Sequence, residues 1–168
     1  MRVGLFPGSF DPFHNGHLEV VERASHLFDS VVVAAVRNPQ KNEPLFTLEE
    51  RKAMLEEALV HLPAVRVVTM STLVVNVAAE VGASAIVKGL RAVSDFENEL
   101  QMAQMNRQLS GVETVFIPTS STHSFIASRL LREVARFGGD VTGFVPPTVA
   151  RRLEERLGGV ALLPWADG

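Results

Sequence analysis

The sequence contains no cysteine, which excludes disulfide bonds, thiolate nucleophiles and cysteine-ligated zinc. It also lacks a long hydrophobic run, because the longest uninterrupted apolar stretch, 31–36, is far short of the ~20 residues that a membrane span needs. The first residues show no basic segment followed by an apolar one, so we expect no secretion leader. We therefore expect a cytoplasmic protein that does not bind membranes.

The sequence also lacks a large excess of charge of either sign. The 16 basic and 19 acidic residues leave a net charge of -3, so nothing in the composition indicates a nucleic-acid surface. We expect no nucleic-acid partner, and any phosphate binding has to come from local placement of charge. The apolar share of 46% and the charged share of 21% are typical of a globular domain and exclude a disordered chain or a coiled coil.

The length of 168 residues fits one domain, which we assign to 1–158. The remaining tail, 159–168, has one apolar patch that includes Trp165 and no pattern that predicts structure. For this tail, docking and disorder both stay open.

Short β-branched runs alternate with longer amphipathic runs along the chain. Apparent capping boxes, in which Thr47 pairs with Glu50 and Ser94 with Glu97, mark two helix starts. Five β-then-α units with nearly continuous apolar strands predict an α/β domain with a doubly wound, five-stranded parallel sheet. In such sheets, ligands bind at the carboxyl ends of the strands near the switch point in strand order. The predicted strands are 2–6, 30–36, 65–69, 83–88 and 113–118, and the predicted helices are 16–27, 47–62, 72–81, 94–109, 124–137 and 146–157.

The end of the first predicted strand carries the most informative stretch, GSFDPFHNGH at 8–17. Gly8 permits a tight turn, Ser9 adds a hydroxyl, and two histidines, His14 and His17, lie at or near a helix start. Free backbone N–H groups and the positive end of the helix dipole favour an anion there, and each histidine adds a donor. A plain turn with a helix cap, or a two-histidine metal site, would use the same residues, but no third metal ligand is evident.

Two other phosphate-binding patterns are missing. No G-x-G-x-x-G follows the first predicted strand, which disfavours a redox dinucleotide enzyme, and G-x-x-x-x-G-K-[ST] is absent, which disfavours a P-loop ATPase.

The HNGH at 14–17 resembles the signature of the HxGH nucleotidylyltransferase superfamily. LFTLEER at 45–51, VKGLR at 87–91 and DFENELQMAQMNR at 95–107 resemble the phosphopantetheine adenylyltransferase family, in register from about residue 2 to residue 157. The resemblance implies a Rossmann-like nucleotidylyltransferase fold, a homohexamer, and reversible transfer of AMP from ATP to 4'-phosphopantetheine. The products would be dephospho-coenzyme A and pyrophosphate, a late step of coenzyme A synthesis. Mg²⁺ is expected to arrive with ATP, without a metal site built from protein side chains.

The resemblance also implies roles for individual residues. His17 would stabilise the transition state at the α-phosphate, with Lys41 and Arg91 as its catalytic partners. The phosphopantetheine site would comprise Ser9, Lys41, Val74 and Lys88. The ATP site would comprise Ser9, Phe10, His17, Gly89, Leu90, Arg91, Glu99, His123, Ser124, Phe125, Ile126, Ala127, Ser128 and Arg129.

Three positions depart from the family pattern. Ala127 and Arg129 stand in a run that is commonly serine, which leaves their side-chain roles open, whereas the backbone N–H groups there are kept. His14 replaces a frequent threonine and is expected to keep a donor in place.

Two further segments need an interpretation. Met102 and Met105 are expected to pack against a neighbouring subunit rather than in the core. Glu50 is expected to cap a helix, and Arg51 to decorate its surface.

Two alternative functions stay open at this point. One is transfer to another acceptor within the superfamily, such as nicotinate mononucleotide; the other is a non-catalytic nucleotide-binding module.

Overall fold

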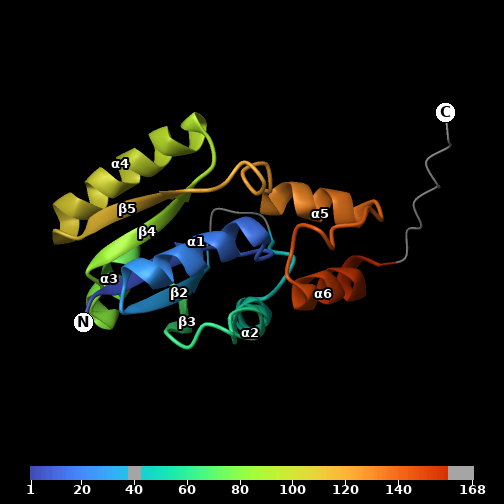
Figure 1. Ribbon diagram of the computed structural model, residues 1–168, viewed down its shortest axis with the longest axis horizontal. Helices are drawn as coiled ribbons and strands as arrows, with labels where there is room; N and C mark the ends of the chain where they lie inside the picture. Colours follow the sequence, from blue (N-terminus) through green and yellow to red (C-terminus); the bar gives the residue numbers. More distant parts are fainter. Residues whose placement is uncertain (38–42, 159–168) are drawn as a thin grey trace.

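The computed structural model describes residues 1–37 and 43–158. Its sheet contains five parallel strands in the order β3-β2-β1-β4-β5 (Figure 1). The predicted fold class, a doubly wound parallel sheet, is therefore confirmed. The strands are β1 (Val3–Gly8), β2 (Ser30–Val36), β3 (Val65–Met70), β4 (Ala85–Leu90) and β5 (Glu113–Pro118). The helices are α1 (Asn15–Leu27), α2 (Leu48–Ala58), α3 (Val74–Val81), α4 (Val93–Ser110), α5 (Ser128–Arg136) and α6 (Pro147–Leu157).

Helices cover both faces of the sheet because the buried strands are apolar on both sides. In β2, Val31, Val33 and Ala35 face the larger core, which includes side chains from α1, α2, α5 and α6. Val32 and Ala34, which alternate with them, face a smaller core that includes side chains from α3. α6 packs against both α2 and α5, and Figure 1 shows α5 and α6 next to each other.

The two predicted capping boxes can be compared with the observed starts of α2 and α4. The Thr47 and Glu50 side chains cap each other's backbone at the start of α2, as predicted. The predicted box of Ser94 and Glu97 is wrong, because α4 begins one residue earlier, after Ala92, with no side-chain cap.

The start predicted for the helix over 124–137 is wrong. The observed α5 begins at Ser128, and the preceding residues form turns instead. The His123 N–H donates to the Ser120 carbonyl oxygen, and the Ile126 N–H donates to that of His123. Turns with hydrogen bonds between residues three apart therefore replace the predicted first turn of the helix, and the His123 side chain in them contacts Glu19 of α1.

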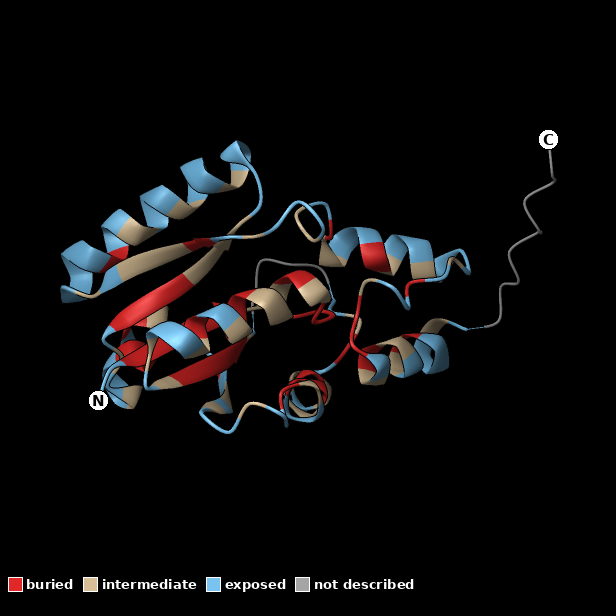
Figure 2. Cartoon of the chain, viewed as in Figure 1, coloured by how far each residue is buried: buried red, intermediate tan, exposed pale blue. Residues whose placement is uncertain are grey.

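The longest helix, α4, is the least covered. Among its 18 residues only Asn106 is buried, and Figure 2 shows the rest as exposed or intermediate. No helix among the described residues combines the length and the apolar character required to cross a membrane.

Candidate active site

Two of the predicted motifs lie at the switch point of the sheet. β1 and β4 are neighbours, and the chain leaves them toward opposite sides of the strand order, to β2 and to β5. The segment with Ser9 follows the carboxyl end of β1, and Arg91 follows the carboxyl end of β4. This is the place where parallel α/β sheets bind their ligands.

The turn after β1 is tightly built around one aromatic ring. Phe10 has a positive φ of 49°, and its ring is 2% exposed, against Phe6 and Phe13. A Cβ on Gly8 would lie 2.7 Å from that ring, so only glycine lets the backbone pass so close. The sequence therefore places Ser9 between a required glycine and a buried phenylalanine.

His14 and His17 cap the start of α1 reciprocally. His14 Nδ1 accepts hydrogen bonds from the backbone N–H groups of Gly16, at 3.1 Å, and His17, at 3.3 Å. His17 Nδ1 accepts one from the His14 N–H at 3.2 Å. An accepting Nδ1 carries no proton, so in each neutral ring the proton sits on Nε2. The backbone thus fixes the tautomer of both rings and leaves His17 with an Nε2–H donor.

Both histidines are neutral around neutral pH. Burial, followed by the charges of Arg91 and His123, lowers the pKa of His14 to about 3. Burial, followed by His14 and then Arg91, holds the pKa of His17 well below its ordinary value. The His14 and His17 rings stack with centroids 3.6 Å apart, so each ring shields one face of the other from water. His17 is therefore a neutral, fixed donor.

The expectation that His14 keeps a donor at the anion site falls on its Nε2–H, because its Nδ1 atom is an acceptor. That atom accepts from two backbone N–H groups, so it caps the helix. Among the described residues, no group of three or more His, Cys, Asp or Glu side chains could hold a metal ion.

Arg91 joins the two predicted halves of the ATP site. Its guanidinium forms a two-bond pair with the Asp95 carboxylate, at 3.0 and 3.3 Å, and donates from Nη1 to the Ile126 carbonyl oxygen at 3.0 Å. The start of α4 and the segment 123–129 are therefore held together by one side chain.

The remaining residues at the β4 end also lie close to one another. The Lys88 ammonium pairs with the Glu99 carboxylate at 3.2 Å, so two residues predicted for different substrates contact each other. A Cβ on Gly89 would lie 2.9 Å from Val20, so glycine lets α1 pack against β4. The Leu90 carbonyl oxygen accepts from the Thr119 N–H at 2.8 Å, which joins the ends of β4 and β5.

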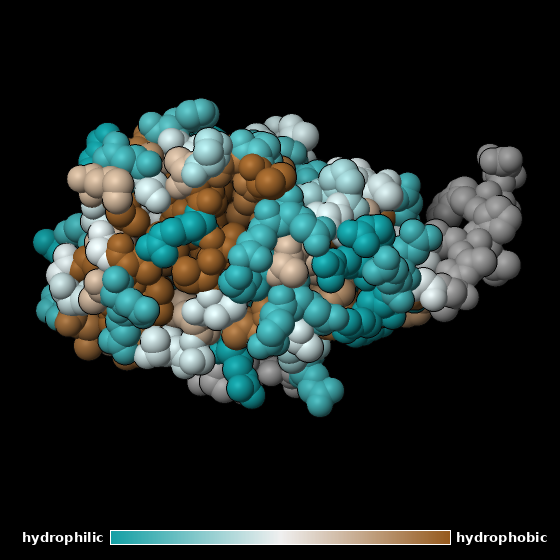
Figure 3. All heavy atoms as spheres, turned by 90° about the horizontal axis from the view of Figure 1, so that it is seen from below, coloured by the Kyte–Doolittle hydropathy of each residue, from teal (hydrophilic) through white to brown (hydrophobic). Residues whose placement is uncertain are grey.

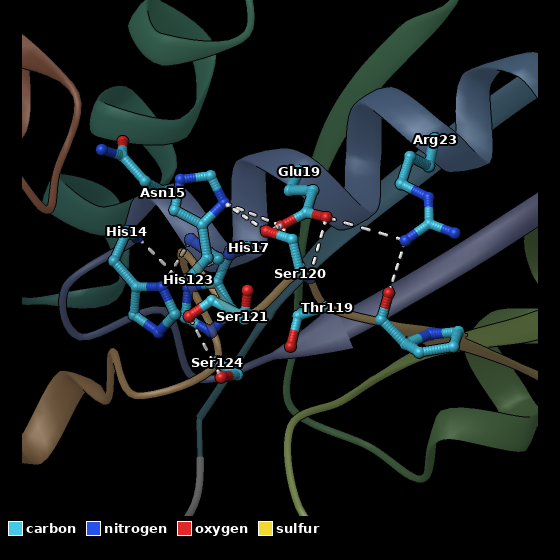
Figure 4. Close-up of polar contacts among 12 residues, drawn as sticks. His14, Asn15, His17, Glu19, Arg23, Thr119, Ser120, Ser121, His123 and Ser124 are labelled. Carbon is cyan, nitrogen blue, oxygen red and sulfur yellow. Dashed lines mark hydrogen bonds and ion pairs between the residues drawn. The ribbon is translucent and has the colours of Figure 1, made fainter.

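A carboxylate from α1 organises the segment before α5 (Figure 4). Glu19 Oε2 lies 2.7 Å from His123 Nδ1 and 3.0 Å from the Ser120 hydroxyl, which donates to it. The Ser120 N–H donates to Glu19 Oε1 at 3.0 Å, and Arg23 forms an ion pair with the same carboxylate. Burial opposes ionisation of Glu19, but the hydrogen bonds from His123 and Ser120 outweigh it and lower its pKa. Sequence reasoning missed Glu19, because its partners are about a hundred residues away.

The other predicted residues of 123–129 differ in their surroundings. Ser128 donates from its hydroxyl to the Pro12 carbonyl oxygen at 2.8 Å, which ties α5 to the turn after β1. Ala127 is the N-cap of α5 and makes no side-chain cap bond, whereas Arg129 is exposed. Phe125 is also exposed, and Ser124 donates to the Ser121 carbonyl oxygen.

Two further residues predicted for the phosphopantetheine site are Val74 and Lys41. Val74 is the first residue of α3 and packs beside the smaller core. Lys41 lies outside the described residues, so its role stays a prediction.

Two buried charged residues beside the site were also missed. Asp11 is 7% exposed and Arg51 is 4% exposed. The expectation that Arg51 decorates a helix surface is wrong, because its guanidinium donates to the Ser9 carbonyl oxygen. Its spacing of three and four residues before Met54 and Leu55 places it on the buried face of α2 and was the available signal.

Comparisons with known proteins agree with this geometry. The family model described as cytidylyltransferase-like matches residues 5–134, which covers both motifs at the switch point and most of α5. The fold and the site therefore define a member of the cytidylyltransferase-like class.

Curated relatives narrow this class. A protein of Alkaliphilus metalliredigens named phosphopantetheine adenylyltransferase is 50% identical over 157 residues, 93% of this chain and 99% of the relative. Proteins with the same name from Heliobacterium modesticaldum and Alkalilimnicola ehrlichii are each 50% identical, over 94% and 99% of this chain and 94% of each relative. The chain belongs to the phosphopantetheine adenylyltransferase family.

Proposed function

We propose that this chain is a nucleotidyltransferase that moves AMP from ATP to 4'-phosphopantetheine and releases dephospho-coenzyme A and pyrophosphate, in coenzyme A synthesis. The identity of 50% along nearly the whole chain to proteins of that name carries the proposal. The site supports it, because a fixed neutral donor and a bridging arginine meet where the sheet binds ligands.

The reaction is a displacement at phosphorus. An oxygen of the acceptor phosphate forms a bond to the α-phosphorus of ATP while the bond to the bridging oxygen breaks, and pyrophosphate leaves. The acceptor is already an anion, so no strong base is required, and no covalent enzyme intermediate is needed. The protein's task is to align two polyanions and to neutralise the charge that develops between them. Alignment alone can contribute roughly 7 kcal/mol or more.

Each residue at the switch point has a part in this proposal. The Nε2–H of His17 and the N–H groups at the start of α1 donate to the α-phosphate, where one preorganised donor is worth about 3 kcal/mol. Arg91 and the turn at 123–129 hold the β- and γ-phosphates. Lys88 and Lys41 place the acceptor phosphate, for which Lys88 has to exchange its partner Glu99 for the substrate.

Magnesium belongs to this proposal as the companion of ATP. The described residues include no cluster of His, Cys, Asp and Glu suited to a metal ion. The ion would accordingly be held by nucleotide phosphates and water, as is common for Mg²⁺. Chelation by EDTA is expected to abolish turnover without changing the unfolding temperature of the free protein.

The acceptor is tested by competition. Pyrophosphate release from ATP and Mg²⁺ is measured with 4'-phosphopantetheine and nicotinate mononucleotide together, and the nucleotide product is identified by mass spectrometry. The proposal predicts dephospho-coenzyme A as the product. A product formed from nicotinate mononucleotide alone would keep the superfamily mechanism and contradict the acceptor. No turnover by protein that still binds ATP would indicate a non-catalytic module.

A homohexamer in the cytoplasm completes the proposal, as the sequence expectation has it. Large apolar side chains of α4 are exposed, among them Met102 at 53% and Met105 at 57%, which fits packing against another subunit. In the view from below, Figure 3 shows apolar side chains gathered on the half that carries the sheet, and a more hydrophilic half around α5 and α6.

The assembly is tested by sedimentation or light scattering. The wild-type chain is expected to have the mass of six copies, and Met105→Glu the mass of a smaller species. Val60→Glu is a matched control, because Val60 is also apolar and is 80% exposed beyond the end of α2. An unchanged mass for Met105→Glu would contradict an interface on α4.

A further inference from the structure

Arg51 carries a buried positive charge that the proposed reaction does not use. Its Nη1 donates to the carbonyl oxygens of Ser9, at 2.6 Å, and Val36, at 2.9 Å. Its Nε donates to the Phe46 carbonyl oxygen at 3.2 Å and makes a longer bond of 3.4 Å to that of Thr47. Within the described residues, the Arg51 side chain donates only to backbone carbonyl oxygens and to no carboxylate. One side chain thus joins the turn after β1, the end of β2 and the start of α2.

Asp11 makes the reverse connection from the turn. Its two carboxylate oxygens accept hydrogen bonds from the backbone N–H groups of Leu45, at 2.9 Å, and Phe46, at 3.0 Å. Its own carbonyl oxygen accepts from Arg132 of α5 at 2.6 Å. Arg51 therefore reaches from α2 to the turn, and Asp11 reaches from the turn to the entrance of α2.

The residue between these two anchored points is in an unfavourable conformation. Phe10 has a φ of 49°, which places a side chain with a Cβ in the left-handed region. Such a conformation persists only where its surroundings hold it in place. Here the Ser9 carbonyl oxygen is held on one side, and the Asp11 carboxylate and carbonyl on the other.

The turn conformation also sets the surroundings of His17. The Phe10 ring meets the His17 ring edge-on, with centroids 5.0 Å apart and planes at 89°. A change in the Ser9–Phe10 backbone would therefore move the Phe10 ring away from His17 and would also move the Ser9 hydroxyl.

We propose that Arg51 and Asp11 are positioning residues, which hold the Ser9–Asp11 turn in its unfavourable conformation and so keep Ser9 and His17 aligned on the reacting phosphates. This inference deepens the proposed function and rests on it for its kinetic part. Stability alone is a poor reason to bury a guanidinium, since well-packed apolar residues often replace buried ionic groups at no loss.

Three variants and one control test the proposal. Arg51→Met removes the hydrogen-bond donors and keeps much of the side-chain volume. Arg51→Lys keeps the positive charge without the planar set of guanidinium donors. Asp11→Asn replaces one of the two accepting carboxylate oxygens. The control is Arg151→Met, because the Arg151 side chain is 59% exposed and pairs only with α2 and α6 carboxylates among the described residues. For each protein we would measure kcat, both KM values, binding of ATP alone by calorimetry, and hydrogen exchange of backbone amides without substrate.

Positioning predicts a split between these readouts. In Arg51→Met and Asp11→Asn, kcat falls about 10- to 100-fold, as expected for misplacement by about 1 Å, while ATP binding changes less than about threefold. Arg51→Lys recovers part of the loss, and Arg151→Met behaves as the wild type. The Leu45 and Phe46 amides exchange faster in Asp11→Asn, as do those of the turn in Arg51→Met.

Several results would overturn the proposal. Folded Arg51→Met with wild-type kcat is one, and a kcat loss matched by an equal loss of ATP affinity is another, because that is the mark of a merely structural role. If Arg51→Met does not fold, Asp11→Asn decides by the same criteria. Exchange unchanged at the turn and at Leu45 overturns the positioning role even if the wild type transfers no AMP. A wild type without turnover but with the predicted exchange changes would contradict the proposed function and leave the positioning role standing.

Discussion

Glu19 and His123 bind each other across 104 residues of sequence, with Glu19 Oε2 2.7 Å from His123 Nδ1. This pair fastens the turn before α5 to the helix that begins with the HNGH motif (Figure 4). The segment 123–129, which we propose binds ATP, is therefore positioned by α1 as well as by Arg91, which donates to the Ile126 carbonyl oxygen.

Glu19→Gln is expected to weaken ATP binding about 10-fold, since hydrogen bonds to a charged group are worth about 1.5–3 kcal/mol and 1.4 kcal/mol is a factor of ten. Calorimetry with ATP measures this. Glu22→Gln is the matched control, because Glu22 lies on the same helix and pairs with the exposed His61. Equal affinities for the two variants would show that the Glu19–His123 pair does not position the ATP segment.

The stability of the free protein should fall as the pH drops below about 6.5. The pKa of His14 is about 3 in the folded protein, and that of His17 is also far below its ordinary value. Between these values and about 6.5 the unfolded chain binds protons that the folded chain does not. Each histidine therefore contributes about 1.4 kcal/mol per pH unit, and this stability is lost as the pH falls.

Urea unfolding at a series of pH values checks this dependence, and His14→Asn isolates one of the two groups. Asparagine is a good N-cap, so the variant should fold while its pH slope falls by about one proton. Glu19 adds a loss of the same sign at lower pH, because its lowered pKa stabilises the fold only while its carboxylate is ionised. A slope identical to that of the wild type would show that His14 does not titrate as described.

Arg91→Lys should reduce kcat/KM for ATP about 100-fold, because one ammonium nitrogen cannot replace the three guanidinium nitrogens that donate to the Asp95 carboxylate and the Ile126 carbonyl oxygen. Steady-state kinetics measures the loss. Arg107→Lys on the same helix changes an exposed pair with Glu113 and should leave kcat/KM unaltered. Similar kinetics for both variants would remove Arg91 from the ATP site.

Local sequence patterns predicted much of this fold. The alternation of apolar runs predicts the five parallel strands, and 30–36 coincides with β2, because buried strands need continuous apolar residues. Thr47 and Glu50 form the predicted capping box, because their spacing of three residues matches the first turn of α2. Ser94 and Glu97 have the same spacing, yet the backbone enters α4 one residue earlier, and residue type alone does not show that choice.

The candidate site was predictable where its residues are neighbours in sequence. His14 and His17 lie within one helical turn, and the structure places both at the start of α1. Glu19 and Arg51 were missed because their roles depend on segments that meet only in the folded chain. The spacing of Arg51 before Met54 and Leu55 indicates the buried face of α2, but its bond to the turn after β1 is not visible in a single sequence.

The most direct test of the account is the rate of the chemical step in His17→Ala. With ATP and phosphopantetheine both bound, rapid quenching of a single turnover measures pyrophosphate formation without product release. The account predicts a rate lower by about 100-fold or more, since a fixed Nε2–H donor is lost at the developing charge, while ATP still binds. A variant that binds both substrates and transfers AMP at the wild-type rate would contradict it.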